Sequence, residues 1–517
     1  MVSISQRIHR LPRIQKYALL FIFLFTAIYW MSGDSVNKIY VPLRTDTHTF
    51  IHSAYYYEDS KSLGKNAIAI VTTMDKRFVS ELSDYTINVI GSNSSDQMMT
   101  KATLTSEHYI RDKCEYMQVL AQTNTVDNLE KLEIEANGVK TLIPIKKPKK
   151  KAPQSVVFCI SPQFAAEQWQ TFLMQVHVAK KYGAHLHIYI VSMVDSYFEL
   201  LREYEKLGLV TLEPWLTIRF AQTMGEYLEP NSHVELRNQA AAHTDCLLMY
   251  KEAADFVGAL DMDDILIPNV GSYHEFFTRE YDGDYKLAAI NFRKHDYEVI
   301  KVGNPAETTI SAILRSAKKL ETADTGKSFF YPDRYNSTWH HFSRVALGVV
   351  QYHPENQAEP YKTHVKWNWS GIFHLRTMIQ VGTEVLPEIE KKPIPMMPWS
   401  DKIHYISEYD LQDIDRDLKN TLSLPQIAPI AARLPREEFY MPIVFQCYNQ
   451  SFYHARSLKQ LDQQHTCINA FDCELPQRKD LPCYHSSADY QSGPAMIPIT
   501  FHWANNATFT KDIGCYQ

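Results

Sequence analysis

Three carboxylates follow an apolar, strand-like segment, and their spacing is the clearest sign of chemistry in the chain. The stretch "ADFVGALDMDDILIP", Ala254 to Pro268, contains Asp261, Asp263 and Asp264. Because side chains two apart on a strand share a face, we expect Asp261 and Asp263 to converge and Asp264 to point away. Such a pair predicts a manganese or magnesium site, and this ion can neutralise a diphosphate as it leaves a sugar.

The same letters allow two other interpretations. An Asp-x-Asp pair also occurs in solvated loops that follow strands. In phosphatases of the haloacid dehalogenase type, an apolar strand is followed by Asp-x-Asp, and the first Asp is the nucleophile. That motif normally opens its domain, whereas three strand–helix units precede Asp261 here. We therefore favour the metal site.

Two later segments concentrate aromatic and basic side chains. "KSFFYPDRYNSTWHHFSRV", Lys327 to Val345, contains Trp339, His340, His341 and Arg344, and "HVKWNWSGIFHLR" contains Trp367, Trp369, His374 and Arg376. Aromatic planes suit sugar faces, while His and Arg suit phosphate and metal. A single Trp or His of this kind is more often structural, so it is the clustering that favours a binding site.

Alternating strands and helices precede the aspartates. Apolar runs at 155–161, 185–192 and 209–215 alternate with helix patterns that begin near Trp169, Asp195 and Glu235. This order predicts an α/β fold with a mostly parallel sheet, Rossmann-like, and helices on both faces. Ligands of such sheets bind beyond the carboxyl ends of the strands, and the aspartates lie at such an end.

The 517 residues exceed one ordinary domain, and composition suggests the divisions. We predict a β-rich stem domain at 36–145, which includes a hairpin turning at Asn137-Gly138. The basic run at 146–152 is read as a linker; a nuclear signal is the alternative. The α/β domain is expected at 153–430 and a Cys-rich extension at 431–517.

The N-terminus resembles a membrane anchor. Arg7, Arg10, Arg13 and Lys16 precede an uncharged apolar run from Tyr17 to Met31. We expect a cytoplasmic tail at 1–16, a transmembrane signal anchor at 17–35 and a luminal remainder, as in a single-pass type II protein. A short span suits a thinner membrane of the early secretory pathway better than the plasma membrane. The alternative is a cleaved signal peptide, although no small-x-small cleavage site follows.

Cysteines and sequons agree with a secretory location. The eight cysteines contain no Cys-x-x-Cys, so we expect disulfides of unspecified connectivity rather than a metal site. Acceptor sequons predict N-glycosylation at Asn93, Asn336, Asn368, Asn449 and Asn506. The net charge of −6 provides no basic field, so nucleic-acid binding is not expected.

Three blocks in this order resemble glycosyltransferase family 92, formerly a domain of unknown function, over about residues 153–380. They are "HTDCLLMYKEAADFVGALDMDDILIP", "KSFFYPDRYNSTWHHFSRV" and "SGIFHLR". The resemblance implies a Golgi-type type II membrane enzyme with a GT-A catalytic domain. It also implies transfer of galactose from a UDP-sugar, with manganese, to a glycan acceptor such as fucose on an N-glycan.

The resemblance also implies roles for particular residues. Asp261 and Asp263 match the family's Asp-x-Asp pair, which holds manganese on the UDP diphosphate, and His374 would complete the metal shell. Trp339, His340, His341 and Arg344 match a block near the active site, as donor- or acceptor-binding residues. Inversion at the anomeric carbon would require a general base, for which Asp264, Asp296 and Asp333 are candidates. A catalytically inactive, glycan-binding relative is the alternative of a different class.

Overall fold

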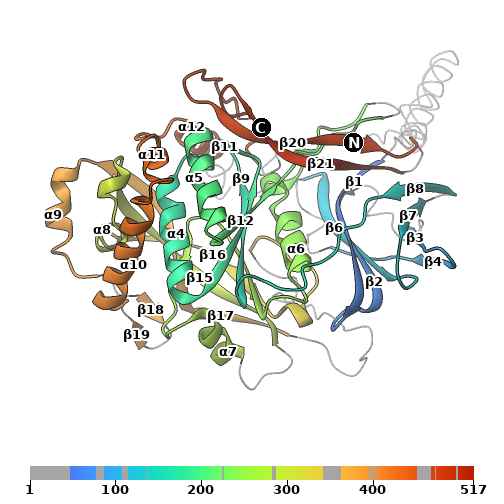
Figure 1. The fold of residues 1–517 in the computed structure, drawn as a ribbon, viewed down its shortest axis with the longest axis horizontal. Helices are drawn as coiled ribbons and strands as arrows, with labels where there is room; N and C mark the ends of the chain where they lie inside the picture. Colours follow the sequence, from blue (N-terminus) through green and yellow to red (C-terminus); the bar gives the residue numbers. More distant parts are fainter. Residues whose placement is uncertain are drawn as a thin grey trace, which may run out of the picture. The chain divides into compact units, whose positions relative to one another are not determined.

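The computed structural model describes most of the residues between Thr47 and Tyr516 (Figure 1). The described residues are 47–76, 87–106, 114–136, 138–223, 226–281, 287–341, 362–394, 397–399, 402–404, 406–450, 467, 469–471, 473–495 and 499–516. Among them, no helix has the length and apolar character needed to cross a membrane. The tail and anchor predicted at 1–35 lie outside these residues, so both stay predictions.

An eight-stranded sheet forms the centre of the α/β region. Its strands, in spatial order, are β12 (Val210–Pro214), β10 (Ala184–Ile190), β9 (Val156–Gln163), β13 (Phe256–Leu260), β16 (Lys318–Phe330), β15 (Leu287–Val302), β17 (Lys362–Val381) and β14 (Asp264–Leu266). The first four are parallel, as predicted. The sheet as a whole is mixed, because β16 and β14 pair antiparallel with their neighbours. These two strands follow the segment on which the prediction rested.

Helices cover both faces of this sheet, which confirms the α/β prediction (Figure 1). Val156, Phe158 and Ile160 of β9 belong to the apolar cluster of α4 (Trp169–Tyr182) and α5 (Asp195–Lys206). Val157 and Cys159 point to the other face and join the cluster of α6 (Gln239–Met249). This period-two division explains why the strand reads as a continuous apolar run.

A seven-stranded sheet joins distant parts of the chain. Its order is β11 (Ser192–Val194), β20 (Cys483–Ser492), β21 (Ile499–Asp512), β1 (Thr47–Ser60), β2 (Gly64–Asp75), β6 (Tyr116–Asn124) and β5 (Thr103–Thr105). The predicted stem, the α/β region and the predicted extension thus share one sheet. Whether the segments divided at residues 145 and 430 fold as separate units stays a prediction. In the structure, strands of all three segments belong to this one sheet.

The remaining elements are smaller. A four-stranded sheet has the order β4 (Gln97–Lys101), β3 (Asn88–Ser92), β7 (Lys131–Ala136), β8 (Val139–Ile143), and β7–β8 is the predicted hairpin. The other strands and α-helices are β18 (Met397–Trp399), β19 (Lys402–His404), α7 (Tyr273–Tyr281), α8 (Ile310–Arg315), α9 (Leu386–Ile389), α10 (Glu408–Leu422), α11 (Ala428–Ala431) and α12 (Tyr440–Tyr448).

All eight cysteines form disulfides, as predicted, and the structure supplies the connectivity that the sequence left open. The bonds are Cys114–Cys467, Cys159–Cys246, Cys447–Cys473 and Cys483–Cys515. Cys159–Cys246 links β9 to α6. The others involve the C-terminal region and tie it to itself or to the segment before β6.

The sequon asparagines differ in exposure. Asn449 and Asn506 are exposed, Asn93 and Asn336 are partly buried, and the side chain of Asn368 lies outside the described residues. Glycosylation at all five stays a prediction.

Acid should destabilise the protein through His187. This β10 residue is fully buried with Nδ1 at 3.2 Å from the Tyr250 hydroxyl, and burial lowers its pKa from 6.5 to about 3. Below pH 6.5 the His187 imidazole binds a proton in the unfolded chain but stays neutral in the folded chain. The free energy of unfolding therefore falls as the pH drops. From pH 7 to pH 5 the expected loss is about 2 kcal/mol.

Denaturant titrations at pH 7 and pH 5 test this. His187→Gln, whose amide does not titrate, should lose less stability than wild type between the two pH values. The half-exposed His274→Gln is the matched control and should behave as wild type. Equal losses in wild type and His187→Gln would contradict the interpretation.

Candidate active site

A cavity of about 490 Å³ opens beyond the carboxyl ends of β9 and β13. The chain proceeds from β9 to β10 on one side and returns to β13 on the other, so the cavity lies at the switch point of the parallel strands. Asp261, Asp263, Lys294 and His374 form one charged part of its lining, and α12 contributes an apolar part. Glu167, Arg376 and Glu438 are further charged residues of the lining. The cavity therefore lies at the edge of the sheet where the sequence predicts the site.

Asp261 is held by two donors. Gln239 Nε2 donates to its Oδ1 at 2.5 Å, and the buried Lys327 Nζ lies 2.7 Å from its Oδ2. Burial alone would raise the pKa of Asp261, but Lys327 and Lys294 hold it well below its usual range. Asp261 is therefore a fixed carboxylate at the edge of the cavity.

Asp264 does not point away from the pair, so that expectation was wrong. Strand β13 ends at Leu260 and a turn intervenes, so strand alternation does not extend across the three aspartates. Asp264 begins β14, is fully buried, and its Oδ2 accepts the backbone N–H of Asp261 at 3.1 Å. Burial raises the pKa of its carboxyl, against the opposing effect of Lys294.

Asp263 and His374, two of the three predicted metal ligands, lie close together, and Asp264 joins them. His374 Nε2 lies 3.3 Å from Asp263 Oδ2, and the three residues each offer a ligand atom within 4.8 Å of the others. The register explains the grouping, since His374 of β17 is opposite Asp264 of β14. Asp261 is outside this group, because its oxygens are directed to Gln239 and Lys327.

Asp296 orients the histidine. It is the partner of His374 in the β15–β17 register, and its Oδ1 lies 2.7 Å from His374 Nδ1. Burial and Lys294 lower the pKa of His374, but Asp263 and Asp296 more than reverse this and raise it to about 9. A second carboxylate on the far nitrogen is the usual support of a metal-binding histidine.

Two buried lysines balance the carboxylates. Lys294 of β15 lies 3.4 Å from Asp264, and Lys327 of β16 lies 3.8 Å from it. Four carboxylates, with Asp296 included, face two ammonium groups, which leaves two negative charges when His374 is neutral. A divalent cation would cancel them, and carboxylate with imidazole is a donor set that manganese accepts. The residues therefore fit the predicted metal.

The aromatic block has a mainly supporting position. Trp339 Nε1 donates to Glu235 Oε2 at 2.9 Å, and His340 Nδ1 lies 3.7 Å from the same carboxylate. His341 lines the cavity, and the carbonyl of His340 accepts from Lys327. Arg344 lies outside the described residues, as do the side chains of Trp367 and Trp369.

The three base candidates do not line the cavity. Asp264 and Asp296 are buried within the charge cluster, and Asp333 is 3.2 Å from Lys61. The described carboxylates that line it are Glu167, Asp261, Asp263 and Glu438. The base role predicted for Asp264, Asp296 or Asp333 and the metal-binding role predicted for Asp261 and Asp263 stay predictions.

A left-handed turn delivers residues that the sequence did not single out. Leu236, Arg237 and Asn238 have φ values of 43°, 56° and 61°, a conformation that costs free energy for residues other than Gly. The turn places Glu235 against Trp339 and begins α6 at Gln239, the donor to Asp261. The predicted helix from Glu235 therefore starts four residues late.

Comparison with known proteins follows this geometry. A family model for glycosyltransferase family 92 matches residues 154–422. The family 92 protein F55C10.4 of Caenorhabditis elegans is 51% identical over 99% of this chain and 100% of its own. The family 92 protein ZK381.2 of the same organism is 39% identical over 94% and 92%. This chain is a glycosyltransferase, and it belongs to glycosyltransferase family 92.

Solved structures are only distantly similar. A mannosyltransferase of Pyrobaculum calidifontis, in complex with GDP-Man and Mn²⁺, is 10% identical, with 62% of this chain and 88% of that chain covered and a TM-score of 0.24. S. aureus TarS 1–349 is 10% identical, with 60% and 88% covered and a TM-score of 0.22. These scores are too low to support a conclusion about this chain.

Removing Lys327 should destabilise the fold, because it leaves Asp261 and Asp264 short of a buried cation. Lys327→Met is expected to cost about 3–5 kcal/mol of unfolding free energy. Adding Asp261→Asn should recover part of the loss, since the two groups are coupled. The control Lys318→Met removes an exposed lysine 3.9 Å from Glu298 and should change stability by less than about 0.5 kcal/mol. Equal effects of the two lysine variants in urea unfolding would contradict this.

Proposed function

We propose that this glycosyltransferase transfers galactose from UDP-galactose to a glycan acceptor, such as fucose on an N-glycan, with inversion and with manganese. The observation that carries the proposal is the Asp263–His374–Asp296 arrangement at the cavity beyond β13. We further propose that it acts as a type II membrane protein of the Golgi, with the described unit in the lumen. The basic residues before the apolar N-terminal run support that orientation.

Asp263 and His374 would hold the manganese ion, with Asp264 as the neighbouring carboxylate. When bound, the ion would act as a Lewis acid that stabilises the departing diphosphate. Asp296 keeps the proton of His374 on Nδ1, so that Nε2 faces Asp263. Lys294 lines the cavity and adds a fixed positive charge beside the position of the diphosphate.

A transfer assay distinguishes the proposal from the inactive, glycan-binding alternative, which predicts that no product forms. The full-length chain is incubated with UDP-galactose, manganese and a fucosylated N-glycan, and the product is measured by mass spectrometry.

Asp296→Asn should weaken the apparent affinity for manganese about 10–100-fold, since it loses the charge that supports His374. The control Asp255→Asn alters an exposed carboxylate and should leave it unchanged.

Wild type that neither transfers nor hydrolyses any UDP-sugar, and does not bind UDP with manganese, would refute the transfer proposal. Glycan binding without transfer would favour the alternative.

Manganese binding should strengthen as pH rises. The metal-free site keeps His374 protonated up to its pKa of about 9. The ion requires the neutral ring, so it competes with a proton at every lower pH. Affinity measured by electron paramagnetic resonance should rise up to about tenfold per pH unit between pH 6 and 8. His374→Gln should bind more weakly with a flatter pH profile, and a wild-type affinity that does not change with pH would contradict this.

A further inference from the structure

We propose that α12 (Tyr440–Tyr448) forms the subsite for the acceptor sugar, with Met441, Phe445 and Tyr448 as an apolar wall. The inference rests on the proposed function and specifies its acceptor side. Helix α12 belongs to the predicted Cys-rich extension and lies beyond residue 422, where the family match ends.

The spacing of these side chains places them together. Met441, Phe445 and Tyr448 stand at i, i+4 and i+7, which is one face of a helix. All three line the cavity that also contains Asp263 and His374. Phe445 is 51% exposed, whereas Tyr440 does not line the cavity and is buried against Ala165 and Cys515. One face of α12 is thus packed into the protein, and a second face presents apolar side chains to the cavity.

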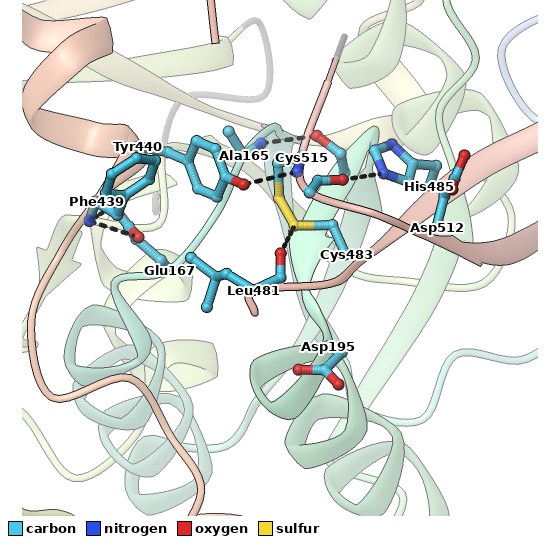
Figure 2. The surroundings of a disulfide bond; sticks show 12 residues. Ala165, Glu167, Asp195, Phe439, Tyr440, Leu481, Cys483, His485, Asp512 and Cys515 are labelled. Atoms are coloured by element: carbon cyan, nitrogen blue, oxygen red, sulfur yellow. Dashed lines mark hydrogen bonds between the residues drawn. A yellow bond between two sulfur atoms is a disulfide. The ribbon is translucent and has the colours of Figure 1, made fainter. Parts of the chain in front are cut away.

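Both ends of α12 are held in place. The buried Glu167 accepts the backbone N–H groups of Phe439 and Met441 at 2.7–2.9 Å, at the start of the helix. Figure 2 shows the next contact, in which the buried Tyr440 hydroxyl accepts the N–H of Cys515 at 3.0 Å. Cys515 is itself bonded to Cys483, which lies in β20.

The disulfide Cys447–Cys473 restrains the other end of α12. The segment before the helix is also bound, because Pro435 accepts from the Trp169 indole at 2.9 Å, and Glu438 accepts from Gln168 at 2.9 Å. A wall fixed in this way can orient a sugar with little loss of conformational entropy on binding.

The chemistry of the wall favours the acceptor over the diphosphate. The helix sequence "YMPIVFQCY" contains no charged residue, so it offers nothing to neutralise a phosphate. The charged end of the cavity, with Asp263, Lys294 and His374, suits the diphosphate and its metal. The acceptor sugar of the proposed reaction, such as fucose, carries no charge. It is attached to a larger glycan that must extend into solvent. Phe445, half-exposed in the cavity wall, suits that position, and an aromatic plane can pack on the C–H face of a pyranose.

Kinetics with the full-length chain test the subsite. Phe445→Ala should raise the KM for a fucosylated N-glycan about 5–30-fold, because it truncates an aromatic anchor. The KM for UDP-galactose, taken from its hydrolysis without acceptor, should stay within about twofold. Phe445→Tyr keeps the ring and should restore the acceptor KM. The matched control Tyr409→Ala removes an aromatic of α10 that is 71% exposed and does not line the cavity.

Direct binding separates failure of this inference from failure of the proposed function. The same glycan is titrated into wild type and Phe445→Ala, with melting temperatures recorded to establish that both are folded. A wild type without transfer or UDP binding would refute the proposed function, while loss of glycan binding in Phe445→Ala would still support the subsite.

Three results would overturn the subsite. They are an unchanged acceptor KM in Phe445→Ala, a raised KM for UDP-galactose in Phe445→Ala, and a wild type that binds no glycan. A raised KM for UDP-galactose would assign the wall to the nucleobase. If Phe445→Ala fails to fold, Cys447→Ser/Cys473→Ser releases α12 without altering the wall. It should raise the acceptor KM while leaving donor hydrolysis within about twofold, and an unchanged acceptor KM would overturn the subsite.

Discussion

The charge cluster that Asp261, after β13, forms with residues of β15, β16 and β17 is the constraint on which the catalytic region depends. Asp261 follows β13, Asp296 and Lys294 belong to β15, Lys327 to β16 and His374 to β17. Each ion that leaves water for the interior costs several kcal/mol unless a partner faces it, so the strands must align these groups. The register in which His374 meets both Asp264 and Asp296 meets that requirement. The contacts that bring the candidate metal ligands together are therefore also contacts that hold these strands in register.

Much of this could be predicted, and the misses have physical causes. The strand–helix order followed from periodicity, and the disulfides followed from the even number of cysteines without Cys-x-x-Cys. The placement of His374 beside Asp263 was implied by the family resemblance. Lys294 and Lys327 were not predicted, because lysines are rarely buried and no local pattern marks one that is. The orientation of Asp264 was missed because strand alternation ends where a strand ends. The contact of Asp296 with His374 was not expected either, because it depends on the register of β15 with β17.

The C-terminal region illustrates the limit of local reasoning. Its prolines, cysteines and weak periodicity predicted a separate, stapled extension. In the structure its strand β20 pairs with β11, and its β21 pairs with β1, so it closes a sheet that begins at the other end of the chain (Figure 1). Contacts such as Gln168 to Glu438 span 270 positions. Pairings of this range depend on the complete fold, and composition carries no record of them.

This arrangement separates two requirements of a transferase. The end of the cavity that we propose for the diphosphate is built from mostly buried, closely paired charges on strands, where a change of one residue disturbs the fold. The end that α12 forms is apolar and partly exposed, and Glu167, Tyr440 and a disulfide hold the helix in place. Its cavity-facing side chains make few demands on stability, so they can be substituted while the charged end is retained. Donor chemistry and acceptor choice would then vary independently, as expected where function is carried by sites on a stable scaffold.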